Sequence, residues 1–360
     1  MQFEWPGSEA GQRLPEKPCG RYRMLTILLR VLLLAAVFPV ASGLLAGCQT
    51  QPAPADPSAM DELIRQLNDD SYQVQSNAIL LLRGSDRQDV RELVVACLKS
   101  EDPGVRGSAV KWVWGQHEKS AVPQLLELLK TESGVAKVNV ARALGAIKDS
   151  DAVEGLVASL GDADAAVRES AAAALGTIGN SAAAKPLAKA LEAEKNPWVV
   201  RQIVEALGQF KSKDGAPAIR TTLASEDSFV RWTCAKALGA IADAESVPAL
   251  IAATKDSEDQ VREFATRSLG QIGDKKAVTC LTGLLSDSSK RVVQAALIAL
   301  AEIGDPQAIP AIQSLGPFEG TLPTPADQAV SIYTDVQAWA LWKLDPKGHK
   351  QPEIRRVGHW

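Results

Sequence analysis

The sequence predicts an all-α fold, an α-solenoid (superhelix) of about nine helical hairpins of roughly 31 residues each. One short pattern recurs along most of the chain at nearly constant spacing, and prolines recur in a single register with it. The apolar residues within each copy follow the 3.6-residue period of an α-helix. Aromatic residues make up only 5% of the chain and hydrophobic residues 46%, a composition that suits closely packed helices better than a β-sandwich.

The recurring pattern is a small or branched apolar residue, often followed by Arg, then Ala four positions on, then Ala-Leu-Gly and Ile. Val167 and Arg168, for example, lead to Ala171, Ala174-Leu175-Gly176 and Ile178. The first residue of each copy, termed its anchor, recurs at an almost constant interval, except that the last interval is longer. The excess predicts a loop inserted at 316–328, which is rich in Gly and Pro. The anchors are Val74, Val105, Ala136, Val167, Val199, Val230, Val261, Val292 and Val336.

Each copy is predicted to hold two helices. Positions 0, 4, 7, 8 and 11 from each anchor fall on one helical face, which defines the second helix. Prolines mark the first helix, because proline is tolerated in a first turn, where its missing N–H has no partner anyway. A hairpin this short cannot cover its own apolar face, so successive copies must stack on a continuous core. Pro123, Pro186, Pro217 and Pro248 precede their anchors by the same interval, and Pro310 keeps the register once the insertion is removed.

These units, over residues 60–345, resemble HEAT-like repeats of the short variety found in phycobilisome-lyase-type proteins. HEAT units link neighbours through an Asp–Arg pair six residues apart, the separation of Asp162 and Arg168 and of Asp256 and Arg262. Ser stands where the acid is expected before Arg106 and Arg231, at Ser100 and Ser225, so the ladder is expected to be incomplete. In HEAT stacks the second helices line the concave side, and partners usually bind there.

The amino-terminal residues 1–47 are predicted to be a signal peptide, with Met24 as an alternative start to Met1. Positive charge precedes a short apolar stretch that ends in Leu45-Ala46-Gly47-Cys48, which resembles the lipobox of bacterial lipoproteins. The resemblance implies a lipid on Cys48 and cleavage before it; an uncleaved transmembrane anchor is the alternative. Residues 48–59 form a Pro/Ala-rich tether. Gln49, rather than Asp, after the lipidated Cys favours the outer membrane over the inner one if the cell has two.

No catalytic residue, metal site or cofactor is predicted. Of the three histidines, only His117 is followed by Glu, and several such pairs hold iron in the HEAT-like deoxyhypusine hydroxylases, so we expect an ordinary polar turn there. Cys97, Cys234 and Cys280 lie in separate units and are expected to be unpaired core residues, with a reactive thiol as the alternative. The repeated glycines are expected at close helix contacts rather than in a phosphate loop. A net charge of −4 argues against nucleic acid as a partner.

Positions two and six after each anchor point away from the predicted core. They carry several cations and a Trp, opposed by Glu169, Glu205 and Glu263, which predicts a mildly basic concave groove for an acidic or extended protein partner. In the alternative, the charges only solvate the surface and the rings pack on neighbours. The candidate partner-binding residues are Lys111, Trp114 (at position nine), Arg142, Arg201, Trp232, Lys236 and Arg267.

The carboxy-terminal end is predicted to be closed by Trp339 and Trp342, followed by a mobile basic tail at 346–360. Together these patterns predict a non-enzymatic scaffold or adaptor, anchored in the cell envelope through Cys48, that binds protein partners. A lyase-like or metal-dependent HEAT-repeat enzyme or helper is the alternative.

Overall fold

The computed structural model describes residues 56–316, 331–333, 335–352 and 354–356. The chain divides into residues 1–50 and residues 51–360, and every described residue belongs to the second unit. The predicted signal peptide, Cys48 and the predicted insertion beyond Gly316 therefore lie outside the described residues.

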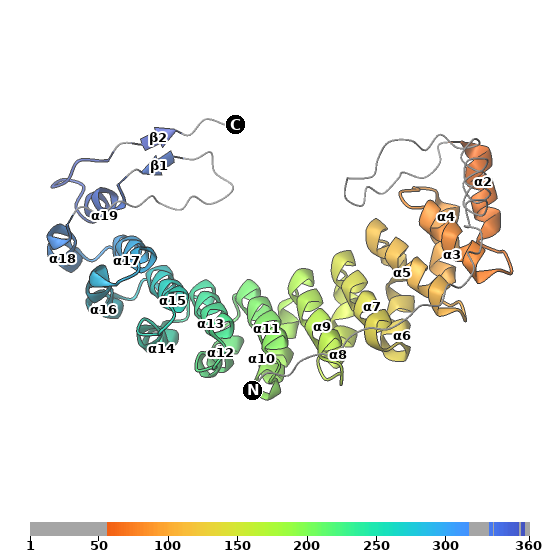
Figure 1. Cartoon of the computed structure of the whole chain (residues 1–360), viewed down its shortest axis with the longest axis horizontal. Coiled ribbons are helices and arrows are strands. Elements are labelled where there is room, and N and C mark those ends of the chain that lie inside the picture. The colour runs from red at the N-terminus through yellow and green to blue at the C-terminus, as the bar shows by residue number, and fades with distance from the viewer. Residues whose placement is uncertain (1–55, 317–330, 334, 353, 357–360) are drawn as a thin grey trace, which may run out of the picture. The chain divides into compact units, whose positions relative to one another are not determined.

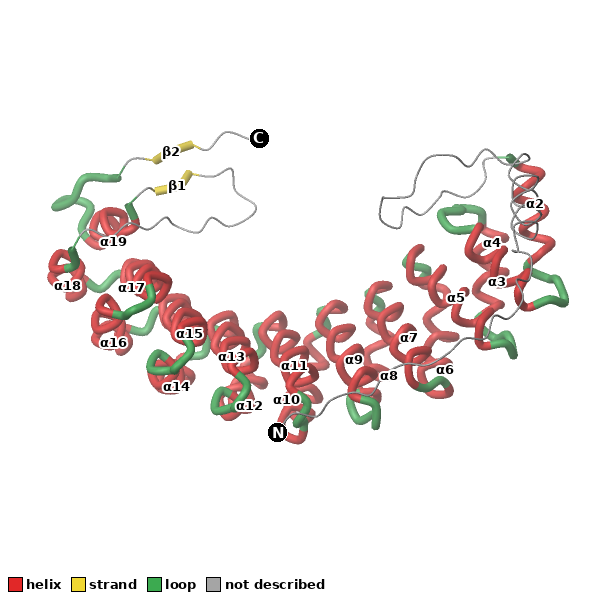
Figure 2. The backbone as a smooth tube through the Cα atoms, in the orientation of Figure 1, coloured by secondary structure: helices red, strands yellow, loops and turns green. Residues whose placement is uncertain are grey.

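Within residues 51–360, α-helices alternate along the chain between two rows (Figures 1 and 2). The predicted α-solenoid of helical hairpins is confirmed. The first helices are α2 (Pro57–Gln66), α4 (Gln88–Cys97), α6 (Val122–Thr131), α8 (Val153–Ser159), α10 (Ala184–Ala193), α12 (Ala216–Thr222), α14 (Val247–Ala253), α16 (Val278–Gly283) and α18 (Ile309–Ser314). The second helices are α3 (Tyr72–Leu81), α5 (Pro103–Gln116), α7 (Gly134–Ile147), α9 (Ala165–Ile178), α11 (Pro197–Phe210), α13 (Ser228–Ile241), α15 (Asp259–Ile272), α17 (Lys290–Ile303) and α19 (Val336–Leu344).

Local sequence sets where these helices begin and end. Several second helices follow an Asp or Asn whose side chain accepts a backbone N–H of the first turn, as Asp102 does from Val105 at 2.9 Å. They end at a residue in the left-handed region, such as Gly179 (φ 76°). A 3-10 turn then leads into the next first helix. Proline lies in the first turn of that helix, as Pro123 does in α6 and Pro248 in α14, in agreement with the predicted register.

The anchors are buried in the hydrophobic core, with two exceptions. Val105, Val167 and Val261 are fully buried, as the period predicts. The first anchor, Val74, is half-buried. The anchor assigned at Ala136 is exposed, so that assignment is wrong as a core position. Here α7 opens on Gly134 in the left-handed region (φ 51°), and Val138, two residues after the anchor, is buried instead.

The Ala-Leu-Gly glycines lie where neighbouring second helices approach most closely. A Cβ added to Gly145 would lie 2.8 Å from the Cα of Ala174, and one added to Gly270 would lie 2.7 Å from the Cα of Ala299. Gly208 faces Ala237 in the same way, at 3.0 Å from its Cβ. Glycine against alanine at these interfaces therefore sets the short distance between the helices.

An ion-pair ladder joins successive units, but each arginine pairs with a carboxylate of the next unit instead of the acid six residues before it. Arg168 donates to the backbone oxygen of Asp162, six residues earlier, and forms its ion pair with Glu194 of the next unit at 2.7 Å. Arg262 likewise bonds the backbone oxygen of Asp256 and pairs with Asp287 at 2.9 Å. The position six residues earlier acts on this arginine through its carbonyl, so Ser100 and Ser225 keep the backbone bonds to Arg106 and Arg231. Arg106–Glu132 and Arg231–Asp256 pair in the same way, and Lys137–Asp162 adds a further rung.

Both ends of the solenoid differ from the sequence-based boundaries. Helix α2 begins at Pro57, within the stretch assigned to the tether, and buries Met60 and Leu63. At the other end, strand β1 (Ser331–Tyr333) pairs antiparallel with β2 (Ile354–Arg356), so part of the tail predicted to be mobile is a strand. Trp339 packs on the core, and Trp342 is half-buried. In the described part of the chain, no helix is both long and apolar enough to cross a bilayer.

Candidate partner-binding face on the second helices

All seven candidate partner-binding residues lie on second helices, and the structure separates them into two groups. Lys111 and Trp114 lie on α5 and Arg142 on α7, and all three are exposed. The other four are carried by three consecutive second helices: Arg201 on α11, Trp232 and Lys236 on α13, and Arg267 on α15. Helix α9 lies between the two groups in the row (Figure 1).

Arg201, Trp232 and Arg267 are half-buried because they pack against aromatic rings. The guanidinium carbon of Arg201 lies 5.2 Å from the ring centre of Trp198 on its own helix, and 5.8 Å from that of Phe229 on α13. Both separations are within the range of a cation–π interaction. One arginine of α11 thus contacts rings from two neighbouring units.

A second set of ring contacts joins α13 to α15. The rings of Trp232 and Phe264 are stacked, with centroids 5.0 Å apart and planes inclined by 24°. The guanidinium carbon of Arg267 lies 6.0 Å from the centre of Phe264, and Arg267 also pairs with the buried Glu263 at 2.7 Å. We call this set the aromatic–arginine cluster: Trp198, Arg201, Phe229, Trp232, Phe264 and Arg267.

Sequence reasoning missed three members of the cluster. Trp198 and Phe229 each directly precede an anchor, and Phe264 lies three positions after one, so none occupies position two or six. Trp198 is 63% exposed and Phe229 56% exposed. A detectable signal was present, because large aromatic residues stand immediately before two successive anchors.

The cluster contains three N–H donors that are buried and have no hydrogen-bond partner: Nε of Arg201, Nε1 of Trp232 and Nε of Arg267. Arg201 moreover has no ion pair within the described ranges, whereas Arg168, Arg231 and Arg262 each contact a carboxylate. A buried donor without an acceptor costs about 1–3 kcal/mol of stability.

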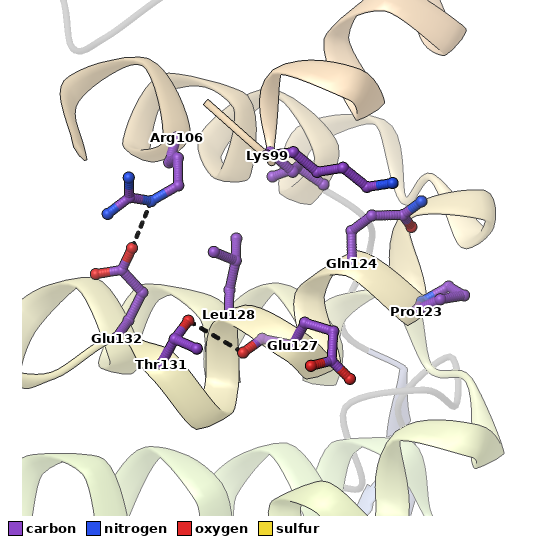
Figure 3. Close-up of a pocket in the computed structure, with 9 residues that line it drawn as sticks. Lys99, Arg106, Pro123, Gln124, Glu127, Leu128, Thr131 and Glu132 are labelled. Carbon is purple, nitrogen blue, oxygen red and sulfur yellow. Dashed lines mark hydrogen bonds and ion pairs between the residues drawn. The ribbon is translucent and has the colours of Figure 1, made fainter. Parts of the chain in front are cut away.

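On the row of first helices, clefts repeat between neighbours. The cleft between α4 and α6 has a volume of about 530 Å³, and the pair of Arg106 with Glu132, 2.6 Å apart, spans one end of it (Figure 3). Similar clefts of about 550 and 600 Å³ lie between α8 and α10 and between α10 and α12. Their recurrence shows that they are the grooves between neighbouring first helices. Two of them contain an ion pair of the ladder, Arg106–Glu132 or Arg168–Glu194. The lining of the first cleft is completed by Leu98, Lys99, Pro123, Gln124, Glu127, Leu128 and Thr131.

Comparison with known families decides what this architecture is. The family model for HEAT repeats matches residues 60–134, 122–202, 184–263 and 247–316. The chain belongs to the HEAT-repeat family. No curated protein matches this HEAT-repeat chain.

Two solved structures with TM-scores above 0.5 agree on the fold. An engineered protein is similar at 21% identity with a TM-score of 0.52, covering 79% of this chain and 87% of that one. Importin beta is similar at 14% identity with a TM-score of 0.53, covering 72% of this chain and 44% of that one. The CpcE–CpcF complex of phycocyanin lyase from Nostoc sp. matches at 25% identity with a TM-score of 0.40, covering 64% of this chain and 94% of that one.

The environments of His117, Glu118 and Cys234 in this HEAT stack are set by the backbone and the core. His117 ends α5 in the left-handed region (φ 52°), and its Nδ1 lies 2.8 Å from the backbone oxygen of Ala146. Glu118 accepts the backbone N–H of Ser120. Cys234 is fully buried, and this burial raises the pKa of its thiol. The described residues contain no group of three or more His, Cys, Asp or Glu placed to hold a metal ion.

Proposed function

We propose that this HEAT-repeat chain is a non-enzymatic scaffold or adaptor that holds protein partners on its second helices. The observation that carries the proposal is the aromatic–arginine cluster, in which Trp198 and Phe229 are exposed beside Arg201, which has no ion pair among the described residues. Aromatic residues and arginine are the side chains that most often dominate the energy of protein interfaces.

The HEAT stack holds this face in place. Gly208 lets α11 approach the Ala237 position of α13, which brings Arg201 within reach of Phe229. On the next interface, Gly239 of α13 lies against Ser268 of α15, and the Ser268 hydroxyl donates to the backbone oxygen of Ala235 at 2.8 Å. A face with fixed side chains loses little conformational entropy when a partner binds.

We further propose that the scaffold is tethered to a membrane of the cell envelope through lipidated Cys48, with the Pro/Ala-rich segment after it as a spacer. The support is the sequence Leu45-Ala46-Gly47-Cys48 and its placement after a short apolar stretch. Gln49 favours the outer membrane in a cell that has two membranes.

The scaffold role is tested by affinity capture from solubilised envelopes with the wild-type chain and an Arg201→Ala/Trp232→Ala variant. We expect the co-purifying proteins to be lost from the variant. Lys130→Ala is the matched control, because Lys130 is an exposed residue of the first helix α6. Unchanged co-purification with the cluster variant would rule out this face.

The tether is tested separately by mass spectrometry of the mature amino terminus and by membrane fractionation. We expect an acylated Cys48 at the new amino terminus and release of a Cys48→Ser variant from the membrane fraction. An intact leader without acyl groups would overturn the tether and leave the binding face unaffected.

A further inference from the structure

We infer that the aromatic–arginine cluster recognises an extended acidic segment of a protein partner, with a partner carboxylate on Arg201 and an adjacent aromatic or branched apolar side chain between Trp198 and Phe229. The inference rests on the proposed scaffold function and names the chemistry of its partner. Its first support is that Arg201 contacts two rings and has no ion pair among the described residues.

Arg201 is the centre of the subsite. Its guanidinium carbon lies 5.2 Å from the ring centre of Trp198 and 5.8 Å from that of Phe229, and a guanidinium presents its N–H donors in one plane. A carboxylate is the acceptor that matches this planar pair of donors, and it binds arginine through two parallel hydrogen bonds. The ladder shows the same geometry inside the chain, where Nε and Nη2 of Arg262 each lie 2.9 Å from an oxygen of Asp287.

The cluster follows three consecutive second helices, with Arg201 on α11, Phe229 on α13 and Arg267 on α15. A ligand that contacts all three must be extended, as a peptide segment is. Neighbouring helices lie roughly 8–10 Å apart and an extended chain advances about 3.3 Å per residue, so about six residues would cross the three helices.

Charge on this face also favours an acidic segment. Lys236 is exposed on α13 and has no carboxylate partner in the described part of the chain. Glu263 is buried and paired with Arg267, with Arg291 4.0 Å away, so its charge is neutralised. Glu205, one turn from Arg201 on α11, is a carboxylate without an ion pair among the described residues, and it disfavours a second acid at that point.

The exposed rings specify the apolar half of the ligand. Trp198 and Phe229 leave 63% and 56% of their surface in water, although Arg201 already contacts both. A side chain laid across both rings would bury apolar surface next to the carboxylate. Phosphate groups would satisfy Arg201 but not the exposed rings, and a neutral sugar would satisfy the rings but not Arg201.

The experiment is a selection of random heptapeptides displayed on phage against the immobilised, purified chain, followed by affinity measurement with fluorescein-labelled copies of the enriched peptides. We expect enriched peptides to carry Asp or Glu beside an aromatic or branched apolar residue. Replacing that acid by its amide should weaken binding by about tenfold to a hundredfold. Arg201→Gln should cause a similar loss, and Arg201→Lys most of it, because lysine keeps the charge but not the paired donors.

Arg65→Gln is the matched control, because Arg65 is an exposed arginine of the first helix α2, outside the row of second helices, and should leave binding unchanged. Circular dichroism of each variant checks that it is folded. The inference is overturned if enriched peptides lack acids, if none is enriched, or if binding survives Arg201→Gln. It is likewise overturned if an oligothymidylate or a neutral chitin hexasaccharide competes fully with the peptides. If envelope proteins still depend on Arg201 in any of these cases, the scaffold function stands and the acidic-segment assignment fails.

Discussion

Arg168 of one HEAT unit and Glu194 of the next are joined by two hydrogen bonds, from Nε to Oε2 at 2.7 Å and from Nη2 to Oε1 at 3.0 Å. The remaining nitrogen, Nη1, donates to the backbone oxygens of Asp162 and Ala163. One guanidinium therefore links the turn between the helices of its own unit to the turn between α10 and α11 in the following one.

At two interfaces the ladder lacks an ion pair, and there both the arginine and the carboxylate are replaced. Val200 stands in the arginine position of its unit, and Ser225 stands where the next unit would carry the acid. At the amino-terminal end, Gln75 stands in for arginine and Ser100 for the acid, while Nε2 of Gln75 keeps the backbone bond, to Asp69, at 2.7 Å. Because the two members disappear together, neither an unpaired arginine nor an unpaired carboxylate remains at these interfaces.

Removing one ladder arginine should destabilise the stack measurably. Arg262→Ala would leave the Asp287 carboxylate, 10% exposed, without its partner and two carbonyls without their donor. We expect the free energy of unfolding, measured by urea titration, to fall by about 2–3 kcal/mol. Arg65→Ala is the control and should lose less than about 1 kcal/mol, since its pair with Glu62 is 74% and 51% exposed. Equal losses would contradict a structural role for the ladder.

The ladder also predicts how stability depends on pH. The hydrogen bonds from Arg262 hold the pKa of Asp287 below its ordinary value, against the opposing effect of burial. The unfolded chain therefore takes up a proton before the folded one does, and this stabilisation, complete above the ordinary pKa of about 4, is lost as the pH falls through the lowered one. We expect the urea midpoint to drop on acidification below about pH 4, and to drop less in Asp287→Asn. An identical pH profile for that variant would argue against this assignment.

Close approach of the second helices can be tested with a methyl group. Gly270→Ala should destabilise the chain by about 1–3 kcal/mol, because the new Cβ would lie 2.7 Å from the Cα of Ala299. Gly107→Ala is the control, since Gly107 lies within α5 with nothing inside 4 Å of the added Cβ. It should stabilise the chain by about 0.5–1 kcal/mol through helix propensity. Thermal unfolding followed by circular dichroism would compare the two, and the same sign for both would disprove the contact.

Burial of Cys234 predicts slow thiol chemistry. Burial raises the pKa of this thiol, and the side chain has no exposed surface, so alkylation requires local opening of the stack. We expect iodoacetamide at about pH 8 to modify Cys234 at least about tenfold more slowly than the half-buried Cys280, as followed by site-resolved mass spectrometry. Comparable rates at the two sites would show that the core around Cys234 is open.

Most of the fold was predictable because its signals are local. The helical period of the second helices, the proline register and the small residues at close contacts each lie within a single repeat unit, and each matches the structure. Ala136 escaped the pattern because Gly134 changes how α7 begins. The site was only half predictable. Arg201, Trp232 and Arg267 followed from the outward positions, whereas Trp198, Phe229 and Phe264 are defined by rings on adjacent units.

By itself the sequence determined the repeat, the two helices in each unit and the face of each helix that enters the core, because hydrophobic periodicity acts over a few turns. Tertiary structure decided that Arg168 pairs with Glu194 and that Arg201 lies over Phe229. The two members of each pair belong to neighbouring units, and their distance in space depends on the rise and rotation from one unit to the next. Packing of whole helices sets that geometry, and no short pattern of residues encodes it.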